Sequence, residues 1–519
     1  MHYIGLFPII FLAAAAASLL FRDRLKLTET SANRWCLGFS VVVFCIYFLL
    51  GWWKYGAFQF GLWDFGIYDS FLHNTAFGKG FMTDFRGGLY DHFSPAILIL
   101  VPFYWLCDTP MHLVWFQSLA MAAGIPVMYL LAKKYLRNPE LALVLAGMYA
   151  LNPYYSRLVL YDFHSECMFP AVFLGGFLAW AYHKRRLAMV LWMGCYLMKE
   201  DFAIPLAGLG LYFLCRKTTW KYGAVLLAWS VVMTLFVLKV YFPLLSDTGY
   251  WHYGRYELFA STAGETWQNA WRMMGRICRP QSGTVLLTLL LPFALLPVLH
   301  GRMFLLVLLP TLGIQLASSA DHQNLLVSHY SSALIGVVPL AALWGMRVLR
   351  RYAWKKHFLS LRNCRIAALF LLVLAGGYHI TCCDLPLTRY YNYVHKWDSK
   401  YHFGLLSLPL RPAYYQAMLE QDARGAELQD VLKMIPAGSL IVCQNELGCP
   451  LLRTHRVRSM PGPAEGADHF LFSGALYSGY DEAGMLNWRV SNCARNPAYE
   501  RVYFDKDILL FARKKDVSK

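Results

Sequence analysis

Residues 36–53 read CLGFSVVVFCIYFLLGWW, an apolar run without a single charged side chain. About 18 to 20 such residues are enough to cross the hydrocarbon core of a bilayer as an α-helix. Similar runs recur along the chain, in which 57% of the 519 residues are hydrophobic and 15% are charged. An ordinary soluble domain has about 25% charged residues. The sequence therefore predicts a polytopic α-helical membrane protein.

The uncharged runs predict about a dozen membrane-spanning helices. Helices are expected because an unpaired backbone amide is costly in lipid, so that each span must satisfy its own hydrogen bonds. The expected spans are 4–21, 36–53, 111–131, 140–160, 167–182, 187–199, 202–214, 222–245, 284–299, 303–319, 332–347 and 365–382. The first run lacks a preceding basic segment, so we interpret it as a helix rather than a signal peptide.

The formal charge of +17 is concentrated in short basic clusters between the apolar runs. Such clusters are typical of cytoplasmic loops. The clusters are 22–34, 133–137, 183–186, 216–221, 300–302 and 347–356. All of them can be cytoplasmic at once if the run 93–106 lies along the membrane surface or re-enters, and both termini are then outside. No basic face or recognition motif accompanies the charge, so we expect no nucleic acid partner.

The spans and loops predict two domains. Residues 1–383 would form the transmembrane domain, with a first outer loop at 54–110. Residues 384–519 would form an extracytoplasmic linker and a small α/β domain whose core starts at about 411, with a helix first. Strands are expected at 439–443, 469–472, 502–504 and 508–511. Cys443 and Cys449 could pair in an oxidising compartment, whereas most other cysteines lie in apolar runs as small buried hydrophobes.

Acidic and aromatic residues gather in the first outer loop. Asp64, Tyr68 and Asp69 follow the second span, and Asp91 and His92 come later in the same loop. On a helix, Asp64 and Tyr68 would share one face. The alternative is that these acids are solvated or cap a helix at the membrane surface.

A second cluster stands at the outer end of a later span. Asp162, His164 and Glu166 alternate, so an extended turn would point all three the same way, as a divalent-metal site or an acid/base centre requires. Charges at the membrane edge are functional candidates. The alternative is a helix N-cap formed by Asp162 or Ser165.

A third cluster, Lys199, Glu200 and Asp201, lies between two apolar runs with almost no loop. Lys199 could neutralise a lipid phosphate or pair with the acids, or the hairpin tip could simply reach interfacial water. Further hydrogen-bonding candidates for a hydroxylated or phosphorylated ligand are Asp321, His322, His329 and Tyr330. A lone histidine in such a place is more often a structural donor.

At 64–69, 91–95, 162–166 and 199–201 the chain resembles the membrane-protein family catalogued as domain of unknown function 2079. The resemblance runs from about residue 40 to the C-terminal tail. That family is similar to the GT-C superfamily of glycosyltransferases, which includes protein mannosyltransferases and the aminoarabinose transferases of lipid A. The resemblance implies a GT-C-like fold and a sugar donor carried on polyprenyl phosphate.

The resemblance also implies roles for particular residues. Asp64 resembles the acid that acts on the acceptor, and would serve as the base. Metal-dependent members keep a second acidic motif at the position of Asp162, His164 and Glu166. The resemblance therefore implies that these three residues are ligands of Mg²⁺ or Mn²⁺. Positive charge for the departing phosphate would come from such an ion or from Lys199, Arg255 or Arg272.

Two sets of site residues are therefore expected. The expected catalytic residues are Asp64, Asp69, Asp162 and Lys199. The expected substrate-binding residues are Tyr68, Asp91, His92, His164, Glu200, Asp201, His329 and Tyr330.

We interpret the chain as a multi-pass inner-membrane glycosyltransferase that moves a sugar from a polyprenyl-phosphate carrier to an envelope acceptor, which is a glycan, lipid or protein, on the outer face. A second interpretation is a transporter or flippase for a polyprenyl-linked or other amphipathic substrate. Transporters carry charges at mid-membrane depth and broken helices in matching halves, whereas here the acids cluster at one face without a visible repeat. A third is a scaffold whose tail binds partners, which predicts that Asp64→Asn leaves function intact.

Overall fold

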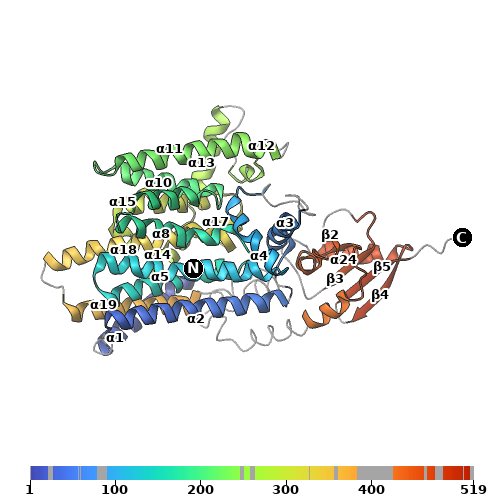
Figure 1. The fold of residues 1–519 in the computed structure, drawn as a ribbon, viewed down its shortest axis with the longest axis horizontal. Coiled ribbons are helices and arrows are strands. Elements are labelled where there is room, and N and C mark those ends of the chain that lie inside the picture. The colour runs from blue at the N-terminus through green and yellow to red at the C-terminus, as the bar shows by residue number, and fades with distance from the viewer. Residues whose placement is uncertain are drawn as a thin grey trace.

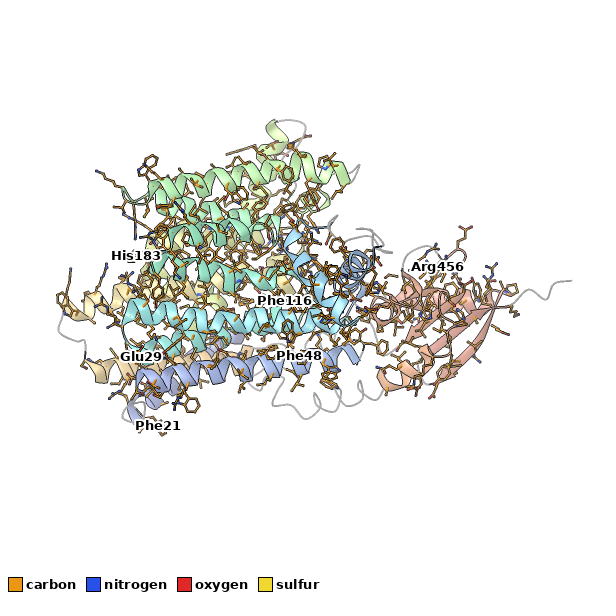
Figure 2. All side chains as sticks on the ribbon, in the orientation of Figure 1. Phe21, Glu29, Phe48, Phe116, His183 and Arg456 are labelled. Atoms are coloured by element: carbon orange, nitrogen blue, oxygen red, sulfur yellow. The ribbon has the colours of Figure 1, made fainter. Side chains whose placement is uncertain are left out.

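The protein combines a helical body with a β-sheet that lies beyond one end of it (Figure 1). The computed structural model describes residues 2–21, 27–56, 58, 60–78, 91–245, 250–256, 263–326, 328–355, 360–382, 425–460, 464–473, 483–505 and 508–514. The side-chain view places Glu29 and His183 at the end of the body away from the sheet, and Arg456 in the sheet (Figure 2).

Every expected span coincides with helix. The main helices of the body are α1 (His2–Leu20), α2 (Glu29–Gly56), α5 (Met111–Leu136), α6 (Pro139–Ala150), α7 (Pro153–Leu160), α8 (Phe169–Ala181), α9 (Arg185–Cys195), α10 (Ala203–Leu214), α11 (Trp220–Phe236), α12 (Phe242–Leu245), α14 (Pro280–Leu290), α16 (Leu309–Ala317), α18 (Ser332–Lys355) and α19 (Leu361–Cys382). Within the described residues, four helices are long and apolar enough to cross a membrane, namely Glu29–Gly56, Met111–Leu136, Trp220–Leu245 and His329–Lys355. Shorter apolar helices accompany them.

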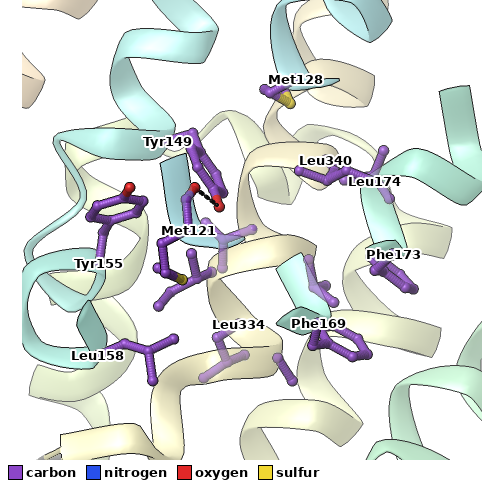
Figure 3. Packing of buried hydrophobic residues seen from close by; sticks show 14 of the residues in the cluster. Met121, Met128, Tyr149, Tyr155, Leu158, Phe169, Phe173, Leu174, Leu334 and Leu340 are labelled. Carbon is purple, nitrogen blue, oxygen red and sulfur yellow. Dashed lines mark hydrogen bonds between the residues drawn. The ribbon is translucent and has the colours of Figure 1, made fainter. Parts of the chain in front are cut away.

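Close packing between helices depends on small residues and on polar side chains that bond to backbone. A Cβ atom on Gly223 of α11 would lie 2.6 Å from the carbonyl oxygen of Gly210 on α10, so only glycine permits this approach. In the core between α5, α6 and α18, the Tyr149 hydroxyl donates to the Met121 carbonyl at 3.1 Å (Figure 3). Such bonds remove the cost of burying a hydroxyl.

Short helices form the end of the body that faces the sheet. They are η1 (Leu62–Gly66), α3 (Ile67–Ala76), η3 (Pro95–Leu100), α4 (Val101–Leu106), η4 (Ser165–Met168), η5 (Glu200–Phe202), η7 (Trp251–Arg255), α17 (Asp321–Asn324) and η11 (Ser328–Ser331). The longer helix α13 (Ala263–Ile277) packs against α16. Together η3 and α4 extend only about 20 Å, less than the ~30 Å hydrocarbon core. Other expected spans contain helices as short as this, so the expectation that residues 93–106 do not cross stays a prediction.

The C-terminal part of the chain folds around a five-stranded sheet in the order β2-β1-β3-β5-β4. Its elements are β1 (Leu440–Cys443), α23 (Asn445–Gly448), η13 (Cys449–Leu451), β2 (Arg456–Ser459), β3 (His469–Ser473), α24 (Ala483–Arg495), β4 (Tyr499–Asp505) and β5 (Ile508–Arg513). Strand β1 pairs in parallel with β2 and β3, and β5 pairs antiparallel with β3 and β4. Four strands lie where the sequence predicts them. Strand β2 was not predicted, and Cys443 and Cys449 are both buried as thiols.

Helix is present at 425–432, ahead of the sheet. The greater part of the helix expected from about residue 411 falls outside the described residues.

Candidate functional site

A buried ion pair lies at the centre of the end that faces the sheet. The Nζ atom of Lys199 lies 2.5 Å from Oε1 of Glu166, and both side chains are buried. Lys199 ends the turn after α9, while Glu166 lies in η4, ahead of α8. Asp201 adds a second, longer contact to Lys199 at 3.9 Å. A buried pair of this kind holds two separate hairpins together, and losing either partner is costly.

Two histidines connect this ion pair to the first outer loop. The rings of His164 and His329 stack with their centroids 3.7 Å apart. His164 Nε2 lies 3.6 Å from Oδ1 of Asp64, and His329 Nε2 lies 3.9 Å from Oε1 of Glu166. The structure therefore brings together Asp64, His164, His329, Glu166 and Lys199, which come from four separate segments of the chain.

The carboxylate of Asp64 is held at the edge of this group. Tyr161 donates its hydroxyl to Asp64 Oδ2 at 2.9 Å, and the Asp64 side chain keeps 16% of its surface exposed. The ring of Tyr68 packs edge-on against His164 with centroids 5.6 Å apart. Asp64 thus combines a fixed position with access to solvent, which a general base needs.

Asp162 lies at the same place but is turned towards backbone. Its Oδ2 atom accepts a hydrogen bond from the backbone N–H of Gly61 at 2.8 Å, and the residue is 0% exposed. Because Gly61 directly precedes η1, this bond fixes the start of the segment that carries Asp64. This contact makes Asp162 a residue that positions the segment, whereas the sequence led us to expect a catalytic acid.

The expected metal ligands Asp162, His164 and Glu166 do not converge on one point. The extended turn that would align them ends at Ser165, where η4 begins, and Glu166 consequently turns towards Lys199. Asp162 bonds to Gly61, and His164 faces Asp64.

A different group of three has metal-binding geometry. The ligand atoms of Asp91, His92 and His252 all lie within 4.8 Å of one another, and they are the only such group among the described residues. The imidazoles stack with centroids 4.5 Å apart, and His252 Nε2 lies 2.9 Å from Asp91 Oδ1. Two imidazoles and one carboxylate suit Zn²⁺ or Mn²⁺.

Glu200 supports this group from behind. Its Oε1 atom lies 2.8 Å from His92 Nδ1 and accepts a hydrogen bond from the Tyr250 hydroxyl at 2.7 Å. The other oxygen accepts from the Phe93 backbone N–H at 2.9 Å. A carboxylate behind an imidazole is the usual arrangement at a metal-binding histidine. The residues present therefore fit a divalent cation, with His92 Nε2 on the side of Asp91.

Electrostatics distinguishes the charged groups of this cluster. Burial alone would raise the pKa of Glu200, but His92, Lys199 and a backbone hydrogen bond together outweigh burial and lower the pKa to about 2. Burial would likewise raise the pKa of Asp91, and His92 and His252 hold it below its usual range instead. Burial and the charge of His92 lower the pKa of His252 to about 4. Both carboxylates are thus ionised and His252 is neutral near pH 7. Burial opposes the charge of His92, but Glu200 and Asp91 outweigh burial and raise the pKa of His92 above 6.5, so a bound cation would have to displace a proton from His92.

A second cation lies near Lys199. The Nη1 atom of Arg255 donates to the Tyr330 hydroxyl at 2.9 Å, and Lys199 Nζ lies 5.4 Å from the centre of the Tyr330 ring. The His322 ring also faces Tyr330, at 5.4 Å between centroids. Arg272 was wrongly grouped with these cations, because it is exposed on α13 and donates to Asn269 in its own helix.

The sheet domain is docked onto the segment that carries Asp64. Asn445 Oδ1 accepts from the Trp63 backbone N–H at 3.0 Å, and Ser459 Oγ accepts from the Trp63 indole at 3.1 Å. Leu62 is buried within the core of the sheet domain, where a Cβ on Gly448 would collide with it. The segment that carries Asp64 is therefore held by Asp162 on one side and by the sheet domain on the other.

Asp69 belongs to this junction rather than to the group around Asp64. Arg453 donates from Nη2 to Asp69 Oδ1 at 2.7 Å and from Nε to Oδ2 at 3.2 Å. The Tyr104 hydroxyl also donates to Oδ1, at 2.9 Å. Asp69 is 2% exposed, so the structure gives it a clamping contact at this junction, and the catalytic role expected for it stays a prediction.

Sequence reasoning missed Tyr161, Tyr250, His252 and Arg453. The run of aromatic, histidine and arginine residues at 250–256 is a usable signal for His252. Arg453 is isolated in the sequence and has no neighbouring motif that would have indicated its contact. The RVR run of β2 likewise gives no indication of a strand or a site.

The fold of the chain is similar to that of a membrane protein whose structure has been solved. The structure of ArnT from Cupriavidus metallidurans bound to undecaprenyl phosphate superposes with a TM-score of 0.52 over 92% of this chain and 98% of that chain, at 15% sequence identity. The apo form of the same protein is similar at 13% identity and a TM-score of 0.46, covering 91% and 97% of the two chains. The chain thus has an ArnT-like fold.

The sequence of the chain identifies its family, which is a more specific grouping than a shared fold. The family described as "Predicted membrane protein (DUF2079)" matches residues 54–460, and the chain belongs to it. A search of curated proteins finds no match.

Proposed function

We propose that the protein is a GT-C-type glycosyltransferase that moves a sugar from a polyprenyl-phosphate carrier to an envelope acceptor on the outer face of the inner membrane. The observation that carries this proposal is the contact of Asp64 with His164 at 3.6 Å, in a group that continues through His329 to Glu166 and Lys199. A carboxylate and a cation at one site match the two needs of glycosyl transfer, which are a base for the acceptor and positive charge for the leaving phosphate.

Asp64 would take the proton from the acceptor hydroxyl or amine as the new glycosidic bond forms. Lys199 and Arg255 flank Tyr330 and would attract the phosphate of the carrier. The sugar–phosphate bond breaks through an oxocarbenium-like state, so charge on the departing phosphate is where fixed cations are most effective. The similar ArnT structure holds undecaprenyl phosphate, which supports a lipid phosphate as the donor's carrier.

A divalent cation would be held by Asp91, His92 and His252, with Glu200 orienting His92. When bound, it would supply Lewis-acid stabilisation of phosphate oxygens. This placement replaces the one we expected at Asp162, His164 and Glu166.

The direction of the protein in the membrane is part of the proposal. His183 lies at the end of the body away from the sheet (Figure 2), within a basic turn typical of the cytoplasmic side. The site and the sheet domain would then face the periplasm or cell exterior, with about twelve spans.

The test is a transfer assay with purified protein, radiolabelled polyprenyl-phosphate sugars and isolated envelope acceptors. Asp64→Asn should lower the rate about 10²–10⁴-fold, as expected for loss of a general base. Asp430→Asn is the matched control, because Asp430 forms an exposed pair with Lys433. Transfer that survives Asp64→Asn would remove the proposed base. Absence of transfer from every donor, with movement of the intact lipid across vesicles, would favour a flippase.

A further inference from the structure

A basic cavity of about 260 Å³ lies at the end of α5 and α18. Four arginines line it, Arg137, Arg347, Arg350 and Arg351, together with Tyr135 and Trp354. None of the lining residues is acidic. The expected cytoplasmic clusters 133–137 and 347–356 supply these arginines, so the cavity lies among the basic loops, away from the candidate site near the sheet.

The local structure holds the arginines without neutralising them. Helix α5 ends at Leu136, and Arg137 adopts a left-handed conformation with φ 49°, which turns the chain aside. The Leu136 carbonyl, exposed by this turn, accepts a hydrogen bond from Arg350 Nη1. The Arg347 guanidinium lies 4.6 Å from the Tyr135 ring centre and 4.7 Å from that of Trp344. Carbonyl and ring contacts orient a guanidinium but leave its charge intact.

One buried donor in this cavity is unused. The Nε atom of Arg350 is buried and has no hydrogen-bond partner among the described residues. An unsatisfied buried donor of a charged group is costly, so a site that holds one is completed by an acceptor from outside. Glu140 does not supply it among the described residues, since its Oε1 atom pairs with Arg365 at 3.0 Å and its Oε2 atom is likewise without a hydrogen-bond partner there.

We propose that this cavity binds the phosphate headgroup of an anionic phospholipid of the cytoplasmic leaflet. The planar guanidinium matches phosphate oxygens two at a time. Basic pockets between helices on the cytoplasmic side bind headgroups with more than one phosphate, such as that of cardiolipin. The volume is slightly smaller than the ~300 Å³ at which pockets for drug-sized ligands begin, which fits a headgroup without its acyl chains.

The rim of the cavity favours a lipid over a free phosphate. Trp354 is 69% exposed beside the arginines, and Tyr352 is 60% exposed on the same helix. Tryptophan and tyrosine prefer the depth of lipid headgroups. Val348 and Leu349, one turn earlier on α18, are also exposed and offer an apolar surface for acyl chains. This site is separate from the proposed transfer reaction, so either can fail without the other.

The test is native mass spectrometry of the full chain released from phosphatidylcholine nanodiscs that contain cardiolipin. The variant Arg347→Gln/Arg351→Gln should retain cardiolipin about tenfold less than the wild type, since each lost ionic hydrogen bond is worth over 1 kcal/mol. The matched control is Lys184→Gln/Arg186→Gln, which removes two exposed charges from a neighbouring basic turn. The control should retain cardiolipin as the wild type does.

Three results would overturn the proposal. Equal loss in the control would show general surface charge. Full displacement by millimolar inorganic phosphate would show a site for the free anion. Equal retention in the pocket variant would show that the arginines hold nothing. A variant that fails to fold is recognised by its melting temperature in pure phosphatidylcholine, and Arg347→Lys then serves instead, because it keeps the charge and removes only the two-pronged geometry.

Discussion

Arg453 and Asp69 lie 384 positions apart in the sequence, yet the guanidinium Nη2 of the first is 2.7 Å from the carboxylate Oδ1 of the second. Arg453 follows η13 in the sheet domain, and Asp69 lies in the first turn of α3, five residues after Asp64. A second acid, Asp108, contacts the same guanidinium. The pair therefore joins the sheet domain to the segment on which the proposed base is carried.

Arg453→Ala should loosen this junction. Loss of one partner of a buried pair costs about 3–5 kcal/mol, because the other charge stays buried. Hydrogen exchange should increase at residues 62–76, and the transfer rate should fall although Asp64 is intact. Lys433→Ala, which breaks the exposed Lys433–Asp430 pair, should change neither. Unchanged exchange in Arg453→Ala would contradict the clamp.

Lys199→Gln should lower both stability and transfer. The change leaves Glu166 buried without its partner, at a cost of about 3–5 kcal/mol. The double variant Lys199→Gln/Glu166→Gln should recover most of the melting temperature, since no unpaired charge is left, while transfer stays low. Should the double variant also regain transfer, Lys199 would be a structural residue and not a phosphate-binding one.

Divalent-cation binding should depend on Asp91, His252 and Glu200. Asp91→Asn or His252→Gln removes a ligand and should abolish tight binding in calorimetric titration of the chelator-treated protein with Zn²⁺ or Mn²⁺. Glu200→Gln should weaken binding about 10–100-fold, as expected for loss of a carboxylate that orients a ligand. Asp162→Asn should leave cation binding intact, because Asp162 bonds to Gly61. If all four variants bind the cation as tightly as the wild type, the proposed cation site is wrong.

Acid should destabilise the sheet domain through His469 on β3. Burial lowers the pKa of His469 below its ordinary 6.5, against the opposite effect of Asp468. The unfolded chain then binds the proton more readily than the folded one, so stability is complete above pH 6.5 and declines as the pH falls below it. His469→Gln should flatten this decline in hydrogen-exchange protection of 440–473. His455→Gln should flatten it less, because the charge of His455 only adds to the effect of burial on the His469 pKa.

The helical body could be predicted because lipid leaves the backbone few choices. Runs such as 36–53 carry no charge and must be helical, and helix is present within each of the expected spans, while their number stays a prediction. The convergence of Asp64, His164 and Lys199 followed from placing their loops on one side of the membrane. The sequence alone could indicate which loops meet, but it could not indicate which atoms pair.

The errors have local physical causes. Asp64 lies in the π-helix η1 and Asp69 in the first turn of α3, and Asp69 contacts Arg453 and Tyr104 instead of the group around Asp64. Glu166 does not point the same way as Asp162 and His164, because η4 begins at Ser165, one residue before Glu166. Strand β2 is short, and its RVRS sequence lacks a hydrophobic run, so only its pairing with β1 reveals it.

The docking of Leu62 and Trp63 against residues beyond 428 has a consequence for biosynthesis. At 5–20 residues per second, about 20 to 80 s separate synthesis of the loop from synthesis of the partners that complete it. During that interval Asp69 has its bond to Tyr104 but lacks Arg453. Under the proposed function, a nascent chain would gain activity only after the sheet domain has folded and fixed the segment that carries Asp64.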